Sequence, residues 1–376
     1  MNLNKTFGRV ATTFVAATML ASVSAVPAFA AYDPGATYTS KVTFNQYLVL
    51  DVNAKAPTFN NITYTIAGVT GENSDGMPIT SGIDPEAVVV SFDGFASTDT
   101  VNTDTVGNVV GQGKSYVSDE VSLDLSKVTF TEPGIYRYSI DPDWAVDTTA
   151  VDGVTLSTDV HYLDVYVVDE SGTLKVDSAV MHDTDATAGN DGEWDKTETK
   201  TNSFIHTYQT KDLTLDKVVA GNMGDKNANF EFKIQVNSTD SSASKTYKIK
   251  YGVNGEKTVT SGEQGTTIDL KHGQTATIYG LSANDTYTIT ETSYANDGYT
   301  TAYTVDVAKA KSAPENATKD NTASGTMGSA EKNVVFYNTR DAVSPTGIVM
   351  NVAPYVLLVV VAAAGCFVFL RKRRED

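Results

Sequence analysis

The sequence contains a single cysteine, Cys366, which lies within an apolar stretch near the C-terminus. A disulfide needs two cysteines, so no disulfide can form within the chain. The rest of the chain also has no thiolate metal site and no cysteine nucleophile. If such a chain is covalently stabilised, a group other than sulfur must form the bond.

Histidine is also scarce, with four residues in 376. They are widely spread, and no nucleophile motif or metal-ligand spacing lies beside them. An enzyme is therefore the weakest of three candidate functions, and we expect no cofactor and no bound metal. The four residues are His161, His182, His206 and His272.

Positive charge is in deficit, with 28 Lys and Arg residues against 46 Asp and Glu residues and a net charge of −18. A chain of this sign repels nucleic acid and anionic membranes, so neither is an expected partner. The densest acidic run, over 183–195, lacks the spacing and the glycine of an EF-hand. We interpret it as a solvated loop, with calcium binding as the alternative.

The N-terminus has the three parts of a secretory signal peptide. Two basic residues precede an apolar stretch over 10–26, and small residues follow up to Ala30. This order predicts a signal peptide over 1–30, cleaved between Ala30 and Ala31.

The C-terminal segment 343–376 combines a short motif, an apolar run and a basic end. Residues 348–370 are mostly apolar, and at about 1.5 Å per residue they can cross a hydrocarbon core of roughly 30 Å. The basic residues 371–374 are expected to stay in the cytoplasm. A plain membrane anchor is one interpretation, but Pro345, Thr346 and Gly347 stand directly before the apolar run.

This order resembles the cell-wall sorting signal of Gram-positive surface proteins. The resemblance implies that a sortase cuts after Thr346, before Gly347, and transfers the acyl group to an amine. In the commonest form of the signal one residue separates the proline from the threonine, whereas here Pro345 directly precedes Thr346. Both wall anchoring and polymerisation therefore remain open as the main fate.

Between these ends the sequence is typical of an all-β protein. Thr, Val, Tyr and Ile are abundant, turn residues recur, and no segment keeps a helical period. The spacing fits antiparallel β-sandwiches. Strands are expected at 42–50, 62–67, 87–92, 135–140, 161–168, 213–219, 230–236, 275–279, 286–291 and 334–338.

The strand pattern starts again near residue 210, which predicts two tandem sandwich domains, 31–209 and 210–341. A closing strand at 203–208 in the first has a counterpart at 333–339 in the second. Residues 186–200 and 308–332 are expected to be long, mobile loops.

Three polar residues of the second domain share a face with apolar neighbours. Side chains alternate along a strand, so Lys217 points the same way as Leu213 and Leu215. The same parity turns Glu291 and Asn338 inwards. Each would cost several kcal/mol to bury unpaired, so we expect the three side chains to meet.

This arrangement resembles the self-crosslinking, Ig-like or CnaB-like domains of Gram-positive, streptococcal-type pilin backbone subunits. The resemblance covers roughly residues 212–347 and includes Phe-Glu-Phe-Lys-Ile at 230–234 and Tyr-Thr-Ile-Thr-Glu at 287–291. It implies an intramolecular isopeptide bond between Lys217 and Asn338, with Glu291 as the catalytic residue of bond formation.

The first domain shares the resemblance but not the reacting residues. The positions of the lysine, glutamate and asparagine are occupied by Gln46, Pro142 and His206. None of these can form the amide by this mechanism. We therefore expect no isopeptide bond in the first domain and a hydrogen-bonded or packed core around Gln46 and His206.

The resemblance also implies an inter-subunit lysine near the end of the first domain. Lys200 and Lys196 are the candidates, and Lys200 is preferred because it lies six residues before His206. The expected function is a secreted, sortase-processed pilus subunit on the cell wall, with a precursor transiently in the membrane. Its expected partners are sortase, copies of itself or other pilins, and peptidoglycan. The alternative is a wall-anchored adhesin or minor pilin whose first domain binds a host surface ligand.

Overall fold

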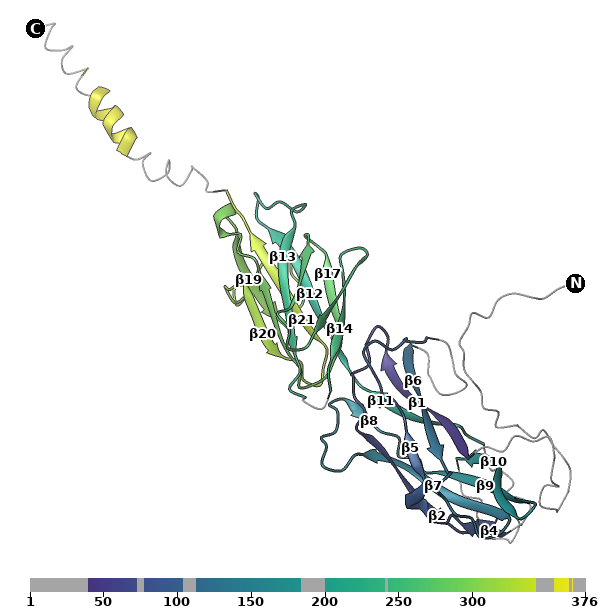
Figure 1. Cartoon of the computed structure of the whole chain (residues 1–376). Helices are drawn as coiled ribbons and strands as arrows, with labels where there is room; N and C mark the ends of the chain where they lie inside the picture. Colours follow the sequence, from purple (N-terminus) through teal and green to yellow (C-terminus); the bar gives the residue numbers. More distant parts are fainter. Residues whose placement is uncertain are drawn as a thin grey trace, which may run out of the picture.

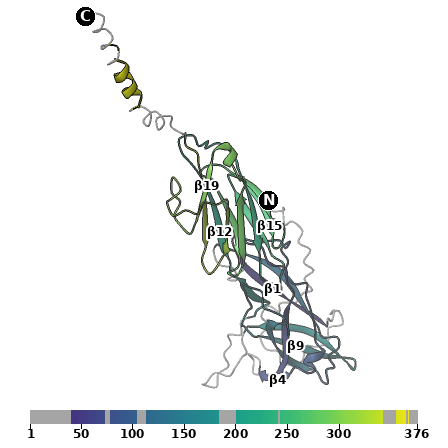
Figure 2. The same ribbon diagram turned by 90° about the vertical axis from the view of Figure 1, so that its left-hand side faces the viewer.

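The computed structural model describes residues 40–72, 78–103, 113–183, 200–240, 243–342, 355–364 and 367. These residues form an all-β protein with two domains in tandem, as the sequence predicted. The domains lie end to end, the first in purple to teal and the second in green to yellow (Figure 1). The same elongated arrangement is seen after a rotation of 90° (Figure 2).

The first domain has two sheets packed on one apolar core. One sheet has five strands in the order β5 (Val89–Ser91), β6 (Lys114–Asp124), β1 (Lys41–Asp51), β11 (Ser203–Tyr208) and β8 (Val154–Thr155). The other follows the order β10 (Thr173–His182), β9 (His161–Glu170), β7 (Gly134–Trp144), β4 (Pro78–Ser81) and β3 (Gly71–Glu72), and β2 (Ile62–Val69) also pairs with β7.

The second domain repeats this plan. Its larger sheet has the order β15 (Gly255–Thr260), β14 (Thr246–Tyr251), β17 (Thr275–Leu281), β12 (Lys211–Ala220), β21 (Lys332–Thr339) and β19 (Thr300–Val305). The smaller sheet has the order β16 (Thr266–Leu270), β13 (Phe230–Asn237), β18 (Thr286–Glu291) and β20 (Thr322–Thr326).

In each domain the first strand pairs with the last in parallel, while most other pairs are antiparallel. The strand β1 pairs with β11, and β12 pairs with β21. Both ends of a domain therefore lie side by side in one sheet, at the position where a bond between them would close the whole domain.

In the second domain, side chains at alternate positions of the strands form the apolar core. Along β13, Phe230, Phe232, Ile234 and Val236 are buried and the residues between them are not. Burying one face of such a strand provides most of the driving force for its pairing, at about 1.5–3 kcal/mol for each large apolar side chain.

Two predictions about elements were wrong in detail. The predicted loop 308–332 contains strand β20, in which Ala323 is buried opposite Ile289. The small and polar residues of this strand carry no clear period, so a local pattern does not predict it. The strand expected at 87–92 is shorter, because a 3₁₀ helix at Pro85–Ala87 precedes β5. A second 3₁₀ helix spans Ala295–Asp297.

The predicted membrane-spanning segment, 348–370, is described only at 355–364 and 367, where the chain is helical. Among the described residues, no helix has both the length and the apolar character needed to cross a membrane.

Candidate functional site

The interior of the second domain contains a lysine and an asparagine on neighbouring strands. In the parallel pairing of β12 with β21, Lys217 lies opposite Phe336 and Asn338 lies opposite Val219. The two polar residues are thus one diagonal apart on the same face of the sheet. Both are completely buried, so the expected inward orientation is confirmed for this pair.

Glu291 reaches the same place from the opposite sheet. It is the last residue of β18, where it continues the buried series of Tyr287 and Ile289, and it lies opposite Phe232 of β13. Its carboxylate oxygen Oε1 accepts a short hydrogen bond from Lys217 Nζ, and neither side chain is exposed. The three residues therefore meet between the two sheets, as the sequence predicted.

Aromatic rings form the wall around the lysine. Its Nζ lies 4.2 Å from the centre of the Phe230 ring and 5.4 Å from that of Phe232. Phe232 packs edge-on against Phe336 with ring centres 5.3 Å apart. Apolar walls exclude water, so charge on either polar group is poorly solvated here.

This environment shifts both acid–base groups towards their neutral forms. Burial lowers the pKa of Lys217 from 10.5 to about 8, although the Glu291 carboxylate acts against the shift. Burial likewise raises the pKa of Glu291, and the neighbouring Lys217, Thr301 and Asn338 side chains oppose the rise. Both shifts therefore favour a neutral amine next to a protonated carboxyl over the corresponding ion pair.

The amide of Asn338 lies beside the Glu291 carboxyl and is one of the groups that oppose the rise of its pKa. Its Oδ1 and Nδ2, and Glu291 Oε2, form no hydrogen bond of good geometry with a described residue. A buried polar group that is poorly paired costs about 1–3 kcal/mol. The amine, the carboxyl and the amide are therefore buried together with few hydrogen bonds to other groups.

The equivalent positions of the first domain follow the same register. Gln46 lies opposite Phe204 and Leu48 opposite His206, which corresponds to Lys217 opposite Phe336 and Val219 opposite Asn338. Pro142 lies opposite Tyr64, as Glu291 lies opposite Phe232. The residues Gln46, Pro142 and His206 therefore occupy the three places of the triad in space.

Hydrogen bonds satisfy Gln46. Its Oε1 accepts a bond of 2.9 Å from the Tyr64 hydroxyl, and its Nε2 donates one of 3.0 Å to Asp119 Oδ2. The same carboxylate oxygen accepts a bond from the Gly94 backbone N–H. Asp119 was not singled out from the sequence, because its partner lies 73 residues away along the chain.

His206 is packed and neutral. Its Nδ1 accepts a hydrogen bond of 3.0 Å from the Ser157 N–H, and its ring meets Phe95 edge-on. Burial lowers the pKa of His206 from 6.5 to about 4.

No described lysine of the first domain is buried, since all of them are at least partly exposed: Lys41, Lys55, Lys114, Lys127, Lys175 and Lys200.

Lys200 is exposed and its backbone is anchored to the end of β10. It forms an isolated antiparallel bridge with His182, and the Thr201 N–H donates a hydrogen bond of 3.0 Å to Met181 O.

Several predicted sites lie outside the described residues: Ala30, Ala31, Lys196, Pro345, Thr346 and Gly347. Of the acidic run 183–195 only Asp183 is described, and the described residues contain no group of His, Cys, Asp and Glu side chains suited to a metal.

Comparison with known families gives a separate match for each domain. Residues 89–209 match a family described as a Spy0128-like isopeptide containing domain. Residues 211–340 match a family described as a domain of unknown function, DUF7601. The match to an isopeptide family thus falls on the first domain, although the buried lysine, glutamate and asparagine lie in the second.

Among curated proteins, the chain is 28% identical over 262 residues to a pilin of Streptococcus pyogenes serotype M1, covering 67% of this chain and 71% of that protein. The chain is a relative of the streptococcal pilins. It is also 37% identical over 140 residues to the pilus tip adhesin Cpa of Streptococcus pyogenes. That match covers 37% of this chain but only 18% of the adhesin.

Solved structures agree with the pilin fold. The major pilin T3.2 of Streptococcus pyogenes superposes with a TM-score of 0.52 at 20% identity, over 81% of this chain and 99% of that structure. Another major pilin of the same species gives a TM-score of 0.50 at 19% identity, over 81% and 100%. At this level of identity the likeness extends to the fold alone.

Proposed function

We propose that this chain is a secreted, sortase-processed structural subunit of a covalent Gram-positive pilus. In this proposal the second domain, 210–341, is closed by an isopeptide bond between Lys217 and Asn338, and the first, 31–209, has no such bond. The observation that carries the proposal is the burial of Lys217, Glu291 and Asn338 together between the two sheets, with Lys217 on the first strand of the domain and Asn338 on the last.

The reaction follows from the groups present. The neutral Lys217 amine attacks Cγ of Asn338, while protonated Glu291 donates a hydrogen bond to the carboxamide oxygen and polarises it. The Nζ–Cγ bond forms and the Cγ–Nδ2 bond breaks. Glu291 carries the proton from the amine to the leaving nitrogen, which departs as ammonia, so no oxidant or cofactor is needed.

The bond would stabilise the domain mainly by restricting its unfolded chain. It closes a loop of roughly 120 residues, which by analogy with a disulfide contributes about 4–5 kcal/mol. Because β12 and β21 are the first and last strands of the domain, a force along the pilus would pass through the bond without unfolding the sandwich.

Intact mass tests the bond. Loss of ammonia lowers the mass by about 17 Da, and Lys217→Ala or Glu291→Ala should abolish this deficit. Lys233→Ala is the matched control, because Lys233 is an exposed lysine on β13 of the same domain. A folded wild-type protein at its full calculated mass would disprove the bond.

Between subunits, sortase would cleave after Thr346 and join it to a lysine of the next subunit, for which Lys200 is the preferred candidate and Lys196 the other. The exposure of Lys200 and the backbone bonds that hold it beside β10 support this choice. The final subunit would be attached to peptidoglycan, which places the protein on the cell surface.

A ladder experiment tests polymerisation. Cell-wall extracts boiled in detergent should contain a series of covalent multimers, which Lys200→Ala should collapse to the monomer, whereas Lys175→Ala should leave the ladder intact. The match to a pilus tip adhesin supports the alternative, a minor pilin or wall-anchored adhesin whose first domain binds a host ligand. An adhesin of this kind would appear without any ladder of its own multimers.

A further inference from the structure

The two domains are joined by a very short connection. The strand β11 ends at Tyr208 and β12 begins at Lys211, so only two residues link them. One of these, Thr210, is buried and donates a side-chain hydrogen bond of 3.1 Å to Asp51 Oδ2 in the first domain. A connection this short limits the orientations of the domains but does not fix one.

A second segment of the chain crosses the boundary. Ser244, which precedes β14 of the second domain, forms a two-way backbone bridge with Thr58 of the first, with N···O distances of 2.8 and 3.1 Å. Ala243 packs against the core of the first domain. The domains thus touch at two places that lie far apart in sequence.

Between these contacts lies a buried lysine, Lys245, which is 1% exposed. Its Nζ donates a hydrogen bond of 2.8 Å to Ser282 Oγ and lies 3.5 Å from Asp285 Oδ1. Its third contact crosses to the first domain, where the backbone oxygen of Asp152 lies 3.4 Å away. A buried ammonium group needs all of these oxygens, because it has lost its water.

Asp285 is held as the counterion. Its Oδ2 accepts hydrogen bonds of 2.8 Å from the Tyr247 hydroxyl and from the Ser282 N–H. Lys245 and Asp285 form an ion pair within the second domain, and Ser282 contacts both partners.

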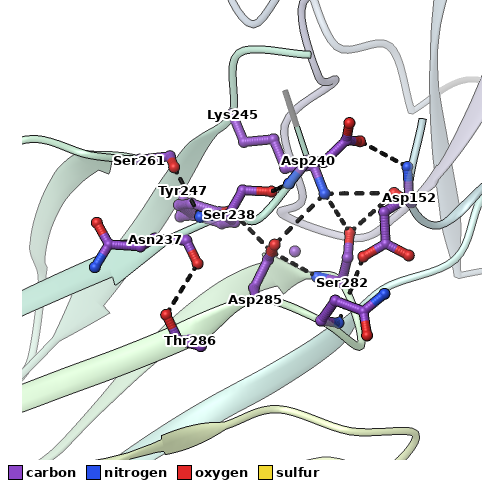
Figure 3. Close-up of polar contacts among 12 residues, drawn as sticks. Asp152, Asn237, Ser238, Asp240, Lys245, Tyr247, Ser261, Ser282, Asp285 and Thr286 are labelled. Atoms are coloured by element: carbon purple, nitrogen blue, oxygen red, sulfur yellow. Dashed lines mark hydrogen bonds and ion pairs between the residues drawn. The ribbon is translucent and has the colours of Figure 1, made fainter. Parts of the chain in front are cut away.

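Asp152 brings the first domain into this network (Figure 3). Its backbone oxygen accepts a hydrogen bond of 3.1 Å from Ser282 Oγ, and its N–H donates one of 2.7 Å to Asp240 Oδ2. Tyr208, at the end of the first domain, lies with its hydroxyl 3.2 Å from Ser282 Oγ. Ser282 is therefore the point at which the contacts from both domains converge.

The backbone next to Asp152 leaves no spare room at the boundary. Gly153 has a φ of +84°, and a Cβ placed on it would lie 2.8 Å from Gln209 O and 3.1 Å from Ser282 Oγ. Only glycine permits this close approach at low cost.

We propose that Lys245, Asp285 and Ser282 form a non-covalent latch that holds Asp152 and thereby fixes the two domains as one rigid rod. Breaking one partner of a buried, hydrogen-bonded pair leaves the other uncompensated, so the latch is either closed or disrupted as a unit. The inference rests on the two-domain division proposed above, but it requires neither the isopeptide bond nor polymerisation.

The latch and the cross-link use buried lysines in different ways. Lys217 lies against aromatic rings and near the Asn338 amide, whereas Lys245 is surrounded by oxygens and faces a carboxylate that accepts two hydrogen bonds. The first environment favours a neutral nucleophile next to a carboxamide, whereas the side chain that faces Lys245 is a carboxylate. We therefore expect Lys245 to retain its amine.

The distance between one spin label on each domain tests the latch. In the full chain with Cys366→Ser, labels are attached through Val146→Cys and Val253→Cys, because both valines are 87% exposed and lie in different domains. Pulsed electron resonance should give one narrow distance distribution for this parent. Lys245→Met and the milder Ser282→Ala should replace it with a broad distribution.

The matched control is Lys248→Met, because Lys248 lies on β14, three residues after Lys245, and pairs with Glu256 at the surface of the second domain. Near-UV circular dichroism checks that each variant is folded, and if Lys245→Met does not fold, Ser282→Ala decides. A distribution that stays as narrow in the folded variants as in the control would overturn the latch. The distance readout is independent of the mass deficit and of the ladder, so failure of the proposed function would be seen separately.

Discussion

The two domains carry different side chains at equivalent positions of the same strand arrangement. In both, the first and last strands pair in parallel with the same register, so that Gln46 corresponds to Lys217 and His206 to Asn338. The first domain satisfies its buried glutamine with Tyr64 and Asp119, whereas the second places a buried lysine amine beside a carboxyl and an amide. A hydrogen-bonded glutamine has no reaction available to it, whereas an amine next to a carboxamide and a carboxyl holds the groups that amide formation needs.

This comparison separates fold from function. The strand pairing that brings the two ends of a domain together is present in both domains, so it does not by itself make a cross-link site. Three side chains and the apolar rings around them make the difference, because they set which groups are charged. The match to an isopeptide family falls on the first domain, whereas the residues that we propose to react lie in the second.

The strongest test of this comparison introduces the lysine, the glutamate and the asparagine into the first domain. We expect the variant Gln46→Lys, Pro142→Glu, His206→Asn to form a second isopeptide bond in the first domain, because the three positions have the same register as Lys217, Glu291 and Asn338. Intact mass should then fall by about 34 Da in total. The first domain should gain about 4–5 kcal/mol against unfolding.

The matched control keeps Pro142 and changes only Gln46 and His206, which removes the catalytic carboxyl and should leave a single ammonia loss. Calorimetry of both variants supplies the unfolding temperatures. If the triple variant folds but loses only one ammonia, an identical register is not sufficient for the reaction.

A second prediction uses pH to distinguish the domains. The pKa of His206 falls from 6.5 to about 4 on folding, because its ring is buried. The unfolded chain binds the proton more readily than the folded one. Protonation of His206 therefore leaves the free energy of unfolding unchanged above about pH 6.5 and lowers it as the pH falls towards 4. The first domain should lose up to about 3 kcal/mol through this residue.

Urea unfolding of the full chain at pH 7.0 and pH 4.5 measures this loss, and His206→Gln should reduce it. Part of the dependence should remain, because burial also lowers the pKa of His161. His272→Gln, in the second domain and partly exposed, should leave the acid sensitivity of the first domain unchanged. An equal effect of the two substitutions would contradict the assignment.

The smallest predicted effect lies at the start of the second domain. The pKa of Asp212 is raised from 3.8 to about 6, mainly by burial and also by the nearby carboxylates of Glu331 and Asp51. The folded state therefore binds the proton more readily, and stability falls as pH rises from about 4 through 6. Because Asp212 is partly exposed, Asp212→Asn should stabilise the chain at pH 7 by no more than about 1 kcal/mol.

The advantage of Asp212→Asn should disappear below pH 4, which unfolding curves at the two pH values can check. Asp269→Asn, an exposed residue of β16 in the same domain, is the control. A gain that persists at pH 3.5 would show that charge is not its cause.

Several features could be predicted from the sequence because they depend on local patterns. Alternation along β13 and β18 predicts which side chains face inwards. The same parity identifies Lys217, Glu291 and Asn338 as polar residues on an apolar face. Strand β20 was missed, because its small polar residues have no period of their own and it is stabilised by pairing with β18. Residues that act through distant partners, such as Asp119 with Gln46, also left no local signal.

The sequence by itself determined the all-β class, the tandem plan and the inward direction of the reacting side chains, since a two-residue period fixes which face each residue occupies. Only the tertiary structure decided that Glu291 reaches Lys217 from the opposite sheet, and that Lys245 meets Asp152 across the domain boundary. Both contacts join residues more than seventy positions apart. Their distances are set by how sheets and domains pack, which no local pattern encodes.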